Sequence, residues 1–237
     1  MVTVLFDIDG TLIQTGGAGQ RAFADTFRTL FHIDKISADV LFAGRSDRAI
    51  AEDLMTVHGI VADDGSWLRF VNAFVPRLVE VLPECQGAVL PGVIELLDEL
   101  EKSDQVLLGL LTGNIAEGAR AKLSYYQLWN RFAFGGFGDD WTDRNDIAAA
   151  ALSAARSYSS QSQLEPQRNH DSESESVIVI GDTPADVQCA RSIGAYAIAV
   201  CTGGASREQL QAEEPDLLLD DLTGFEVIIQ QINSVIV

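Results

Sequence analysis

Short runs of almost exclusively apolar residues, separated by segments with helical periodicity, constrain the fold of this chain most strongly. Such runs suit strands that are buried on both faces, as in parallel sheets covered by helices on each side. We therefore predict an α/β fold built on an open parallel sheet, with functional residues at the carboxyl ends of its strands. The predicted strands cover residues 2–6, 106–111, 177–180, 197–201 and 217–219, and 132–134 is a weaker candidate.

Helical periodicity fills the intervals between these strands. Pro91 is expected at the first position of one helix, because its fixed φ angle and missing N–H fit that position. The other predicted helices cover residues 115–128, 144–156, 184–193 and 224–232. This alternation predicts right-handed crossover connections between parallel strands.

Residues 16–87 interrupt the alternation, because they contain helical patterns only. Pro76 lies inside the third pattern and is expected to kink or split it. We predict an all-helical cap domain of residues 16–87 above a catalytic core formed by residues 1–15 and 88–237. A decorated crossover packed flat on the sheet is the alternative. The three apolar stripes are Phe23, Phe27, Leu30 and Phe31; Ile50, Leu54 and Val57; and Trp67, Phe70, Val71, Phe74 and Leu78.

Residues 157–176 form a second exception to the alternation. The segment is polar and rich in serine, and it holds almost no large apolar side chains that could order it by burial. We predict a surface loop between a helix and the strand at 177–180.

Charge and cysteine usage exclude several classes of function. The chain has 35 acidic and 16 basic residues and a net charge of -19, which disfavours nucleic acid and membrane partners. An anionic substrate would therefore need a metal ion or local positive charge. Three cysteines without CxxC spacing argue against a disulfide framework and a structural zinc site. Without a membrane-length apolar run or a signal-peptide pattern, we expect a cytoplasmic protein.

Two aspartates directly follow the first predicted strand. Asp7 and Asp9 are two residues apart, so their carboxylates are expected on one side of the chain, while Gly10 allows a sharp turn. Paired carboxylates suit a nucleophile with a general acid, or a magnesium site. An ordinary acidic turn at a strand end would show the same residues.

A second acidic pair follows the strand at 177–180. Asp182 and Asp186 are placed near the first turn of a helix that starts around Pro184. The helix dipole favours acidic residues there in any case. Two acidic clusters at the carboxyl ends of strands nevertheless indicate a site for a hard cation with oxygen ligands.

Polar groups also follow the strand at 106–111. Thr112, Gly113 and Asn114 offer a hydroxyl and free backbone N–H groups that suit a phosphate, although a plain capping turn has the same sequence. Arg144 opens the next predicted helix, where its guanidinium can pair with phosphate and with the acidic cluster. A surface arginine beside acidic neighbours is the alternative.

In their order along the chain, these motifs resemble those of the haloacid dehalogenase-like hydrolases, in particular their phosphatase branch. The resemblance covers essentially the whole chain, and Pro-Gly-Val at Pro91 and Gly-Gly-Phe-Gly-Asp-Asp before Arg144 are similar to the phosphoglycolate-phosphatase-like group. It implies a Rossmann-like core with a helical cap inserted after the first strand. It also implies Asp7 as the nucleophile, Asp9 as the general acid and base, and Thr112 as a ligand of the phosphoryl group.

The resemblance further implies a magnesium site. Asp7, Asp182 and the backbone carbonyl of Asp9 would hold Mg²⁺, with Asp186 in support. Most relatives have lysine at the third motif. Here Arg144 is the assigned residue, and Lys122, inside the preceding helix, is the competing cation.

The predicted function is that of a magnesium-dependent phosphatase that hydrolyses a small phosphorylated metabolite through an aspartyl phosphate. A sugar phosphomutase has the same machinery and stays open, as does a phospho-aspartate signalling module, which needs about half this length and no insert. Within the insert, Arg45 is expected to contact the leaving group, although an exposed arginine at a helix start fits equally well. The expected protein is a monomer or homodimer.

Overall fold

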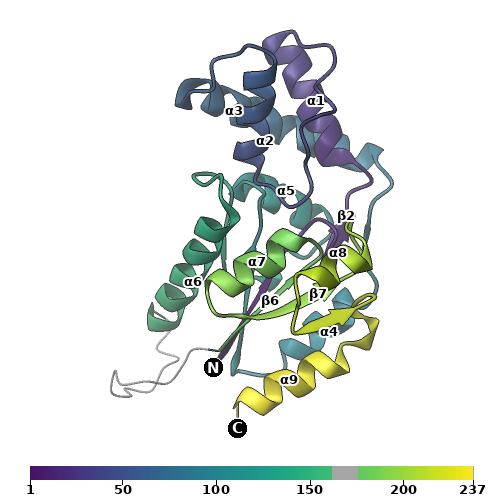
Figure 1. The fold of residues 1–237 in the computed structure, drawn as a ribbon, viewed down its shortest axis with the longest axis vertical. Coiled ribbons are helices and arrows are strands. Elements are labelled where there is room, and N and C mark those ends of the chain that lie inside the picture. Colours follow the sequence, from purple (N-terminus) through teal and green to yellow (C-terminus); the bar gives the residue numbers. More distant parts are fainter. Residues whose placement is uncertain (162–175, 237) are drawn as a thin grey trace.

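A six-stranded parallel sheet forms the centre of the protein (Figure 1). The computed structural model describes residues 1–161 and 176–236. The strand order is β5-β4-β1-β6-β7-β8, so β1 lies between β4 and β6, and their carboxyl ends meet at one edge. The predicted parallel α/β sheet is therefore confirmed. The strands are β1 (Val2–Phe6), β4 (Val106–Leu111), β5 (Phe134–Gly136), β6 (Ser176–Gly181), β7 (Tyr196–Val200) and β8 (Leu217–Leu219).

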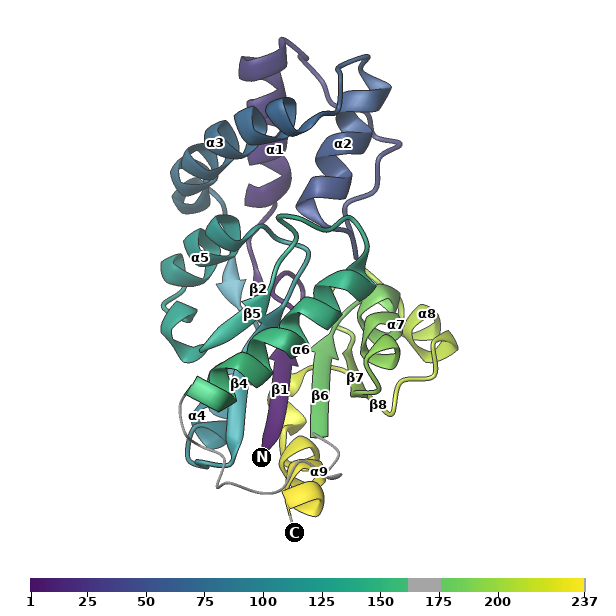
Figure 2. The same cartoon turned by 90° about the vertical axis from the view of Figure 1, so that its left-hand side faces the viewer.

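Helices cover both faces of the sheet (Figure 2). Alternate side chains of β1 point to opposite faces, so Val4 and Phe6 contribute to one apolar cluster and Leu5 to the other. Within the described residues, no helix is long and apolar enough to cross a membrane. The first cluster includes α4 (Val93–Leu100), α5 (Ala116–Tyr125) and α9 (Glu226–Ile236), and the second includes α6 (Arg144–Gln161), α7 (Pro184–Ser192) and α8 (Arg207–Ala212). Short 3-10 turns occur at Leu82–Glu84, Trp129–Arg131 and Leu222–Gly224.

Several predicted boundaries differ from the structure. The helix α4 starts at Val93 because Gly92 adopts a left-handed φ of 79°, so Pro91 lies in a turn outside the helix. The strand β5 lies two residues beyond the predicted 132–134, because the chain pairs with β4 only from Phe134 onward. Residues 157–161, predicted as part of a loop, continue α6; residues 162–175 of that prediction lie outside the described residues.

Residues 16–87, which we call the cap, contain three helices that gather above the carboxyl edge of the sheet (Figures 1 and 2). They share their own apolar cluster, in which the rings of Phe23 and Phe74 lie 4.7 Å apart. Of the two outcomes expected for Pro76, a split is wrong, since the third helix is continuous through it, and a kink stays a prediction. The helices are α1 (Ala18–Phe31), α2 (Asp47–Val57) and α3 (Asp64–Val81).

A two-stranded antiparallel ribbon connects the cap to the core. It pairs β2 (Ile13–Gln14) with β3 (Ala88–Val89), at the two points where the chain passes between cap and core. The domain boundaries at residues 15/16 and 87/88 stay a prediction. The ribbon lies next to both of them.

Candidate active site

The turn after β1 fits closely against Asp182. Gly10 has a φ of 91°, and a Cβ atom at this position would lie 2.4 Å from Oδ2 of Asp182. The hydroxyl of Thr11 donates a 3.0 Å hydrogen bond to the other carboxylate oxygen of Asp182. Only glycine combines this positive φ with the absence of a Cβ atom. The turn therefore holds Asp7 and Asp182 at the same edge of the sheet.

Three buried carboxylates form a cluster at this edge. Asp7, Asp182 and Asp186 each offer an oxygen within 4.8 Å of the others. Burial, then the charge of Asp186, raises the pKa of Asp7 to about 7, and the same two causes raise the pKa of Asp182 well above its ordinary value. Both directions follow from burial and from the mutual repulsion of the carboxylates, which a bound cation would offset. A hard divalent cation with oxygen ligands fits this donor set.

Arg144 supplies part of that positive charge from the first turn of α6. Its guanidinium contacts Asp186 and lies 3.5 Å from an oxygen of Asp7. Burial alone would lower the pKa of Arg144, but Asp186 and Asp7 outweigh it and raise the value. The Nε atom of Arg144 is buried and has no hydrogen-bond partner in the described part of the chain.

Asp186 is fixed by the start of α7. Its second carboxylate oxygen accepts hydrogen bonds from the backbone N–H (3.0 Å) and the hydroxyl (2.6 Å) of Thr183. This is a capping box, which ties the orientation of Asp186 to the helix N-terminus. Asp186 therefore positions Arg144 and completes the acidic cluster.

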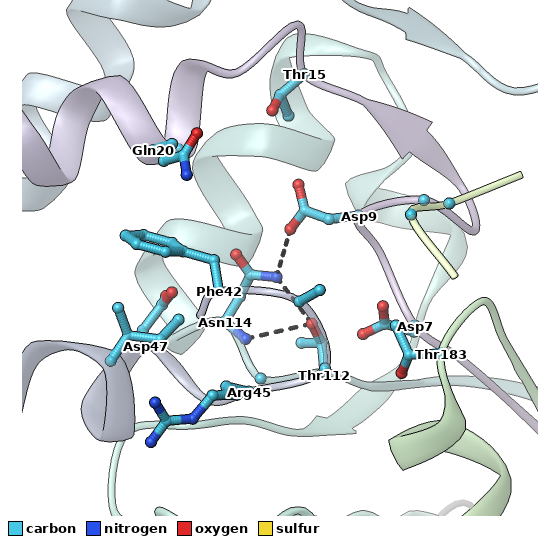
Figure 3. A pocket seen from close by; sticks show the side chains of 18 of the residues that line it. Asp7, Asp9, Thr15, Gln20, Phe42, Arg45, Asp47, Thr112, Asn114 and Thr183 are labelled. Atoms are coloured by element: carbon cyan, nitrogen blue, oxygen red, sulfur yellow. Dashed lines mark hydrogen bonds between the residues drawn. The ribbon is translucent and has the colours of Figure 1, made fainter. Parts of the chain in front are cut away.

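Asp9 points away from this cluster, toward the cap (Figure 3). Its Oδ2 accepts hydrogen bonds from Lys122 at 2.6 Å and from the side-chain amide of Asn114 at 2.8 Å. Lys122 also donates to the amide oxygen of Asn114, at 2.6 Å. The side chain of Asp9 is thus held by a network of its own, separate from the carboxylates of Asp7 and Asp182.

Lys122 is charged although it is buried. Burial lowers its pKa, but Asp9 and Asp47 outweigh this effect, and the net pKa lies above the ordinary value. The structure therefore places the two competing cations at different acids. Arg144 lies beside Asp7 and Asp186, and Lys122 beside Asp9.

The loop after β4 carries the predicted phosphate ligands. The hydroxyl of Thr112 is buried and accepts hydrogen bonds from the backbone N–H (3.3 Å) and the side-chain amide (2.8 Å) of Asn114 (Figure 3). Gly113 has no room for a side chain, since a Cβ atom would lie 2.2 Å from the carbonyl oxygen of Arg45. The loop from the cap that contains Arg45 lies directly on this turn.

Asp47, at the start of α2, holds the cap to the core. Its backbone N–H donates to the carbonyl of Gly113 at 2.7 Å, and its carboxylate accepts from the N–H of Ile115 at 2.9 Å. Burial raises the pKa of Asp47 to about 6, even though Lys122 and the Ile115 N–H act in the opposite direction. These contacts join the cap to the residues that follow Thr112.

Arg45 lines the same cavity, but its guanidinium pairs with Asp53 at 2.7 Å. Its side chain extends away from Asp7 and Thr112 (Figure 3). The contact between Arg45 and a leaving group stays a prediction.

A cavity of about 310 Å³ extends from the acidic cluster into the cap. Core residues Asp7, Asp9, Thr112 and Asp182 line one end. The lining from the cap and the segment leading into it includes Thr15, Gln20, Phe23, Phe42, Ile50 and Phe74. The cavity is thus large enough for a small ester, with its reacting end at Asp7 and the remainder beneath the cap.

Sequence reasoning gave too little weight to Lys122 and missed Asp47. Lys122 belongs to a helix with many small residues, and no local pattern shows that it reaches Asp9. Asp47 has the same sequence signal as any acidic residue in the first turn of a helix. In both residues the function depends on contacts between segments far apart in the chain.

Comparison with known proteins gives a family match over most of the chain. A family model described as haloacid dehalogenase-like hydrolase matches residues 4–200. The "Probable phosphatase IndB" of Dickeya dadantii is 26% identical over 220 residues, covering 92% of this chain and 88% of that protein. The phosphoglycolate phosphatase of Synechococcus elongatus is 27% identical over 226 residues, 93% of each chain. A solved hydrolase from Pseudomonas syringae is 21% identical and superimposes with a TM-score of 0.70, covering 98% of this chain and 99% of that one.

Proposed function

Because this chain belongs to the haloacid dehalogenase-like hydrolase family, as its motifs predicted, we propose that it is a magnesium-dependent phosphatase acting on a small phosphomonoester. The observation that carries the proposal is the division of its acids into two sets. Asp7 lies in a buried cluster suited to a cation, and Asp9 is held apart beside the cap. Two carboxylates in different surroundings suit a nucleophile and a proton shuttle.

In this proposal Asp7 is the nucleophile. Its carboxylate attacks phosphorus in line with the leaving oxygen, and the P–O bond to the leaving group breaks as the aspartyl phosphate forms. Asp7 reacts as a carboxylate, so its raised pKa must fall when the site is loaded. Before the site is loaded, the nearby guanidinium of Arg144 favours the ionised form of Asp7.

Asp9 transfers the proton. It protonates the leaving oxygen and then removes a proton from the water that attacks the aspartyl phosphate, which returns Asp7 and releases phosphate. The position of Asp9 between Asp7 and the cap suits both steps, because the leaving group must lie there (Figure 3). Lys122 and Asn114 hold Asp9 in this orientation.

The loop after β4 binds the transferred group. Thr112, Gly113, Asn114 and Arg144 line the cavity, and the Thr112 hydroxyl, the backbone N–H of Gly113 and the guanidinium of Arg144 are the proposed donors to the phosphoryl oxygens. Donors held in place before the reaction stabilise the charge that builds up on these oxygens.

Mg²⁺ fits the acidic cluster, with Asp7 and Asp182 as ligands, the backbone carbonyl of Asp9 as a third and Asp186 in support. When bound, it supplies charge neutralisation between the attacking carboxylate and the phosphoryl oxygens. In the protein alone, Arg144 is the cation that opposes the three carboxylates. The relatives named as phosphatases support the same activity.

A panel of phosphomonoesters, assayed for phosphate release with and without Mg²⁺, tests this proposal. We expect turnover that requires Mg²⁺, disappears with a chelator and is lost in Asp7→Asn. Turnover by Asp7→Asn equal to that of the wild type would contradict the proposed nucleophile. Turnover at full rate in metal-free protein would contradict the proposed metal site.

The same assay separates the alternatives. A sugar phosphomutase would convert a sugar phosphate to its isomer and release little inorganic phosphate, which phosphorus NMR distinguishes. A phospho-aspartate signalling module would be phosphorylated without repeated turnover. The cavity beneath the cap, next to Asp9, supports an enzyme that binds a leaving group.

A further inference from the structure

The part of the cavity beneath the cap has a composition that restricts the leaving group. We infer that the substrate is a phosphomonoester whose leaving group is uncharged and has an apolar face, and that a leaving group with a carboxylate, such as that of phosphoglycolate, is disfavoured. The inference rests on the proposed phosphatase function. We call this part the leaving-group pocket; it is bounded by Thr15, Gln20, Phe23, Phe42, Ile50 and Phe74.

One wall of the leaving-group pocket is apolar. Phe23 packs edge-on against Phe42, with ring centroids 5.2 Å apart, and in a tilted arrangement against Phe74, with centroids 4.7 Å apart. Phe23, Ile50 and Phe74 are buried, Phe42 is half-buried, and all four line the cavity. An apolar face of the leaving group gains free energy when it covers this wall.

The leaving-group pocket also offers polar groups without charge. The hydroxyl of Thr15 and the amide of Gln20 lie on the cap side of Asp9 (Figure 3). Neither side chain has a hydrogen-bond partner within residues 1–161 and 176–236. Both can donate to and accept from a hydroxyl or another neutral polar group.

Each cation that lines the cavity already has an acidic partner. Arg45 pairs with Asp53 at 2.7 Å and Lys122 with Asp9 at 2.6 Å. Arg144 lies at the phosphoryl end, beside Asp7. In the described residues, no cation of the lining is left for a carboxylate of the leaving group.

Two acids lie where such a carboxylate would have to stand. Asp47 lines the cavity beside Phe42 and Ile50, and Asp9, which is ionised until it takes up the proton that it transfers, lines the cavity near the leaving oxygen. Lys122 offsets one of these two negative charges. Like charges a few ångströms apart repel strongly in a partly buried site. The net charge of -19 adds to this repulsion. The pocket therefore selects against an anionic leaving group by charge, and not by size.

Three esters of primary alcohols test the inference without large differences in leaving-group reactivity. Phosphoglycolate carries a carboxylate where 2-hydroxyethyl phosphate carries a neutral hydroxymethyl group. Benzyl phosphate carries an apolar ring at the same position. With Mg²⁺ and the full chain, we expect kcat/KM for 2-hydroxyethyl phosphate to exceed that for phosphoglycolate at least about tenfold. Benzyl phosphate should be hydrolysed at least as efficiently as 2-hydroxyethyl phosphate.

Variants of the pocket separate its two properties. Phe42→Ala should lower kcat/KM about tenfold for benzyl phosphate and by a clearly smaller factor for 2-hydroxyethyl phosphate, which covers less of the apolar wall. Gln20→Lys places a cation in the pocket and should raise the activity toward phosphoglycolate selectively. Gln211→Lys on α8 makes the same change of net charge outside the cavity lining, and should leave the substrate preference unchanged.

A preference of the wild type for phosphoglycolate over 2-hydroxyethyl phosphate would overturn the inference while leaving the phosphatase function intact. If Arg45→Ala then removed that preference, Arg45 would have to leave Asp53 and bind the carboxylate. If the protein with Mg²⁺ hydrolysed none of the three esters and no p-nitrophenyl phosphate, the proposed function would be overturned, and the inference with it.

Discussion

Lys122 donates a 2.6 Å hydrogen bond to Oδ2 of Asp9, across 113 positions of the sequence. The lysine is 5% exposed, and the same carboxylate oxygen accepts a second hydrogen bond from Asn114. A side chain held by two donors has little rotational freedom. Lys122 is therefore a positioning residue that keeps the proposed proton shuttle directed toward the leaving group.

Replacement of Lys122 tests this role. Lys122→Met should lower kcat/KM for alkyl phosphates, by less than the loss of about 10²–10⁴-fold typical for removal of the acid itself. The loss should be smaller for aryl phosphates, whose leaving oxygen needs little protonation, and Lys122→Arg should recover part of it. Removal of one partner of a buried ion pair also costs stability, so melting temperatures must accompany the rates.

The matched control is Lys102→Met, which replaces an exposed lysine after α4. It should change neither the rate nor the stability appreciably. Equal losses for alkyl and aryl phosphates in Lys122→Met would contradict a role that acts through Asp9.

Asp47 should make the stability of the metal-free protein depend on pH. Burial raises its pKa to about 6 from 3.8, so the folded protein keeps a proton that the unfolded chain releases between these values. The stabilising contribution of this proton is complete below about pH 4 and is lost as the pH rises through about 6. Asp47→Asn should therefore gain stability relative to the wild type with rising pH, by on the order of 3 kcal/mol at most.

Denaturant unfolding of both proteins from pH 4 to pH 8, in the presence of chelator, measures this difference. Asp104→Asn, at an exposed acid of the core, is the control and should show a constant offset. A difference between wild type and Asp47→Asn that does not change with pH would contradict the assignment.

Binding of Mg²⁺ should strengthen as the pH rises toward neutrality. Burial and Asp186 raise the pKa of Asp7 to about 7, and the cation requires the ionised carboxylate. Below that pH, the apparent dissociation constant should increase by about tenfold per pH unit for each ligand carboxylate that must lose a proton. Calorimetric titrations at several pH values measure the slope. Asp182→Asn should bind Mg²⁺ much more weakly at every pH, and unchanged binding would exclude Asp182 as a ligand.

The sequence predicted the chemistry of the core because that chemistry lies in local motifs. A parallel sheet brings the residues after β1, β4 and β6 to one edge, so Asp7, Thr112 and Asp182 meet for topological reasons. The tight turn at Gly10 is also a local feature. The ends of strands and helices were less predictable. Pro91, for example, lies in a turn before α4, because the same residue types occur in turns and at helix starts.

The cap side of the site could not be predicted in this way. Asp47 and Lys122 reach the cavity through packing between segments far apart in the sequence, and local patterns do not record such contacts. The pairing of Arg45 with Asp53 likewise depends on the path of one loop. The residues that select the substrate therefore lie on the cap side, where local sequence patterns predict least.

Asp7→Asn and Asp9→Asn should fail at different steps. Asp7→Asn removes the nucleophile, so no phosphoenzyme forms and turnover falls to background. Asp9→Asn keeps the nucleophile and loses the proton shuttle. Its phosphorylation step should be slow with alkyl phosphates and much less impaired with p-nitrophenyl phosphate, whereas dephosphorylation is slow with both.

The proposed mechanism requires a covalent phosphate on Asp7. Stopped-flow of Asp9→Asn with p-nitrophenyl phosphate and Mg²⁺, combined with acid quench, borohydride reduction of the acyl phosphate and peptide mass spectrometry, tests it most directly. We predict a burst of p-nitrophenol that approaches one equivalent of enzyme, followed by slow turnover, with the reduced residue at position 7. The absence of a burst, or a modified residue elsewhere, would contradict the account.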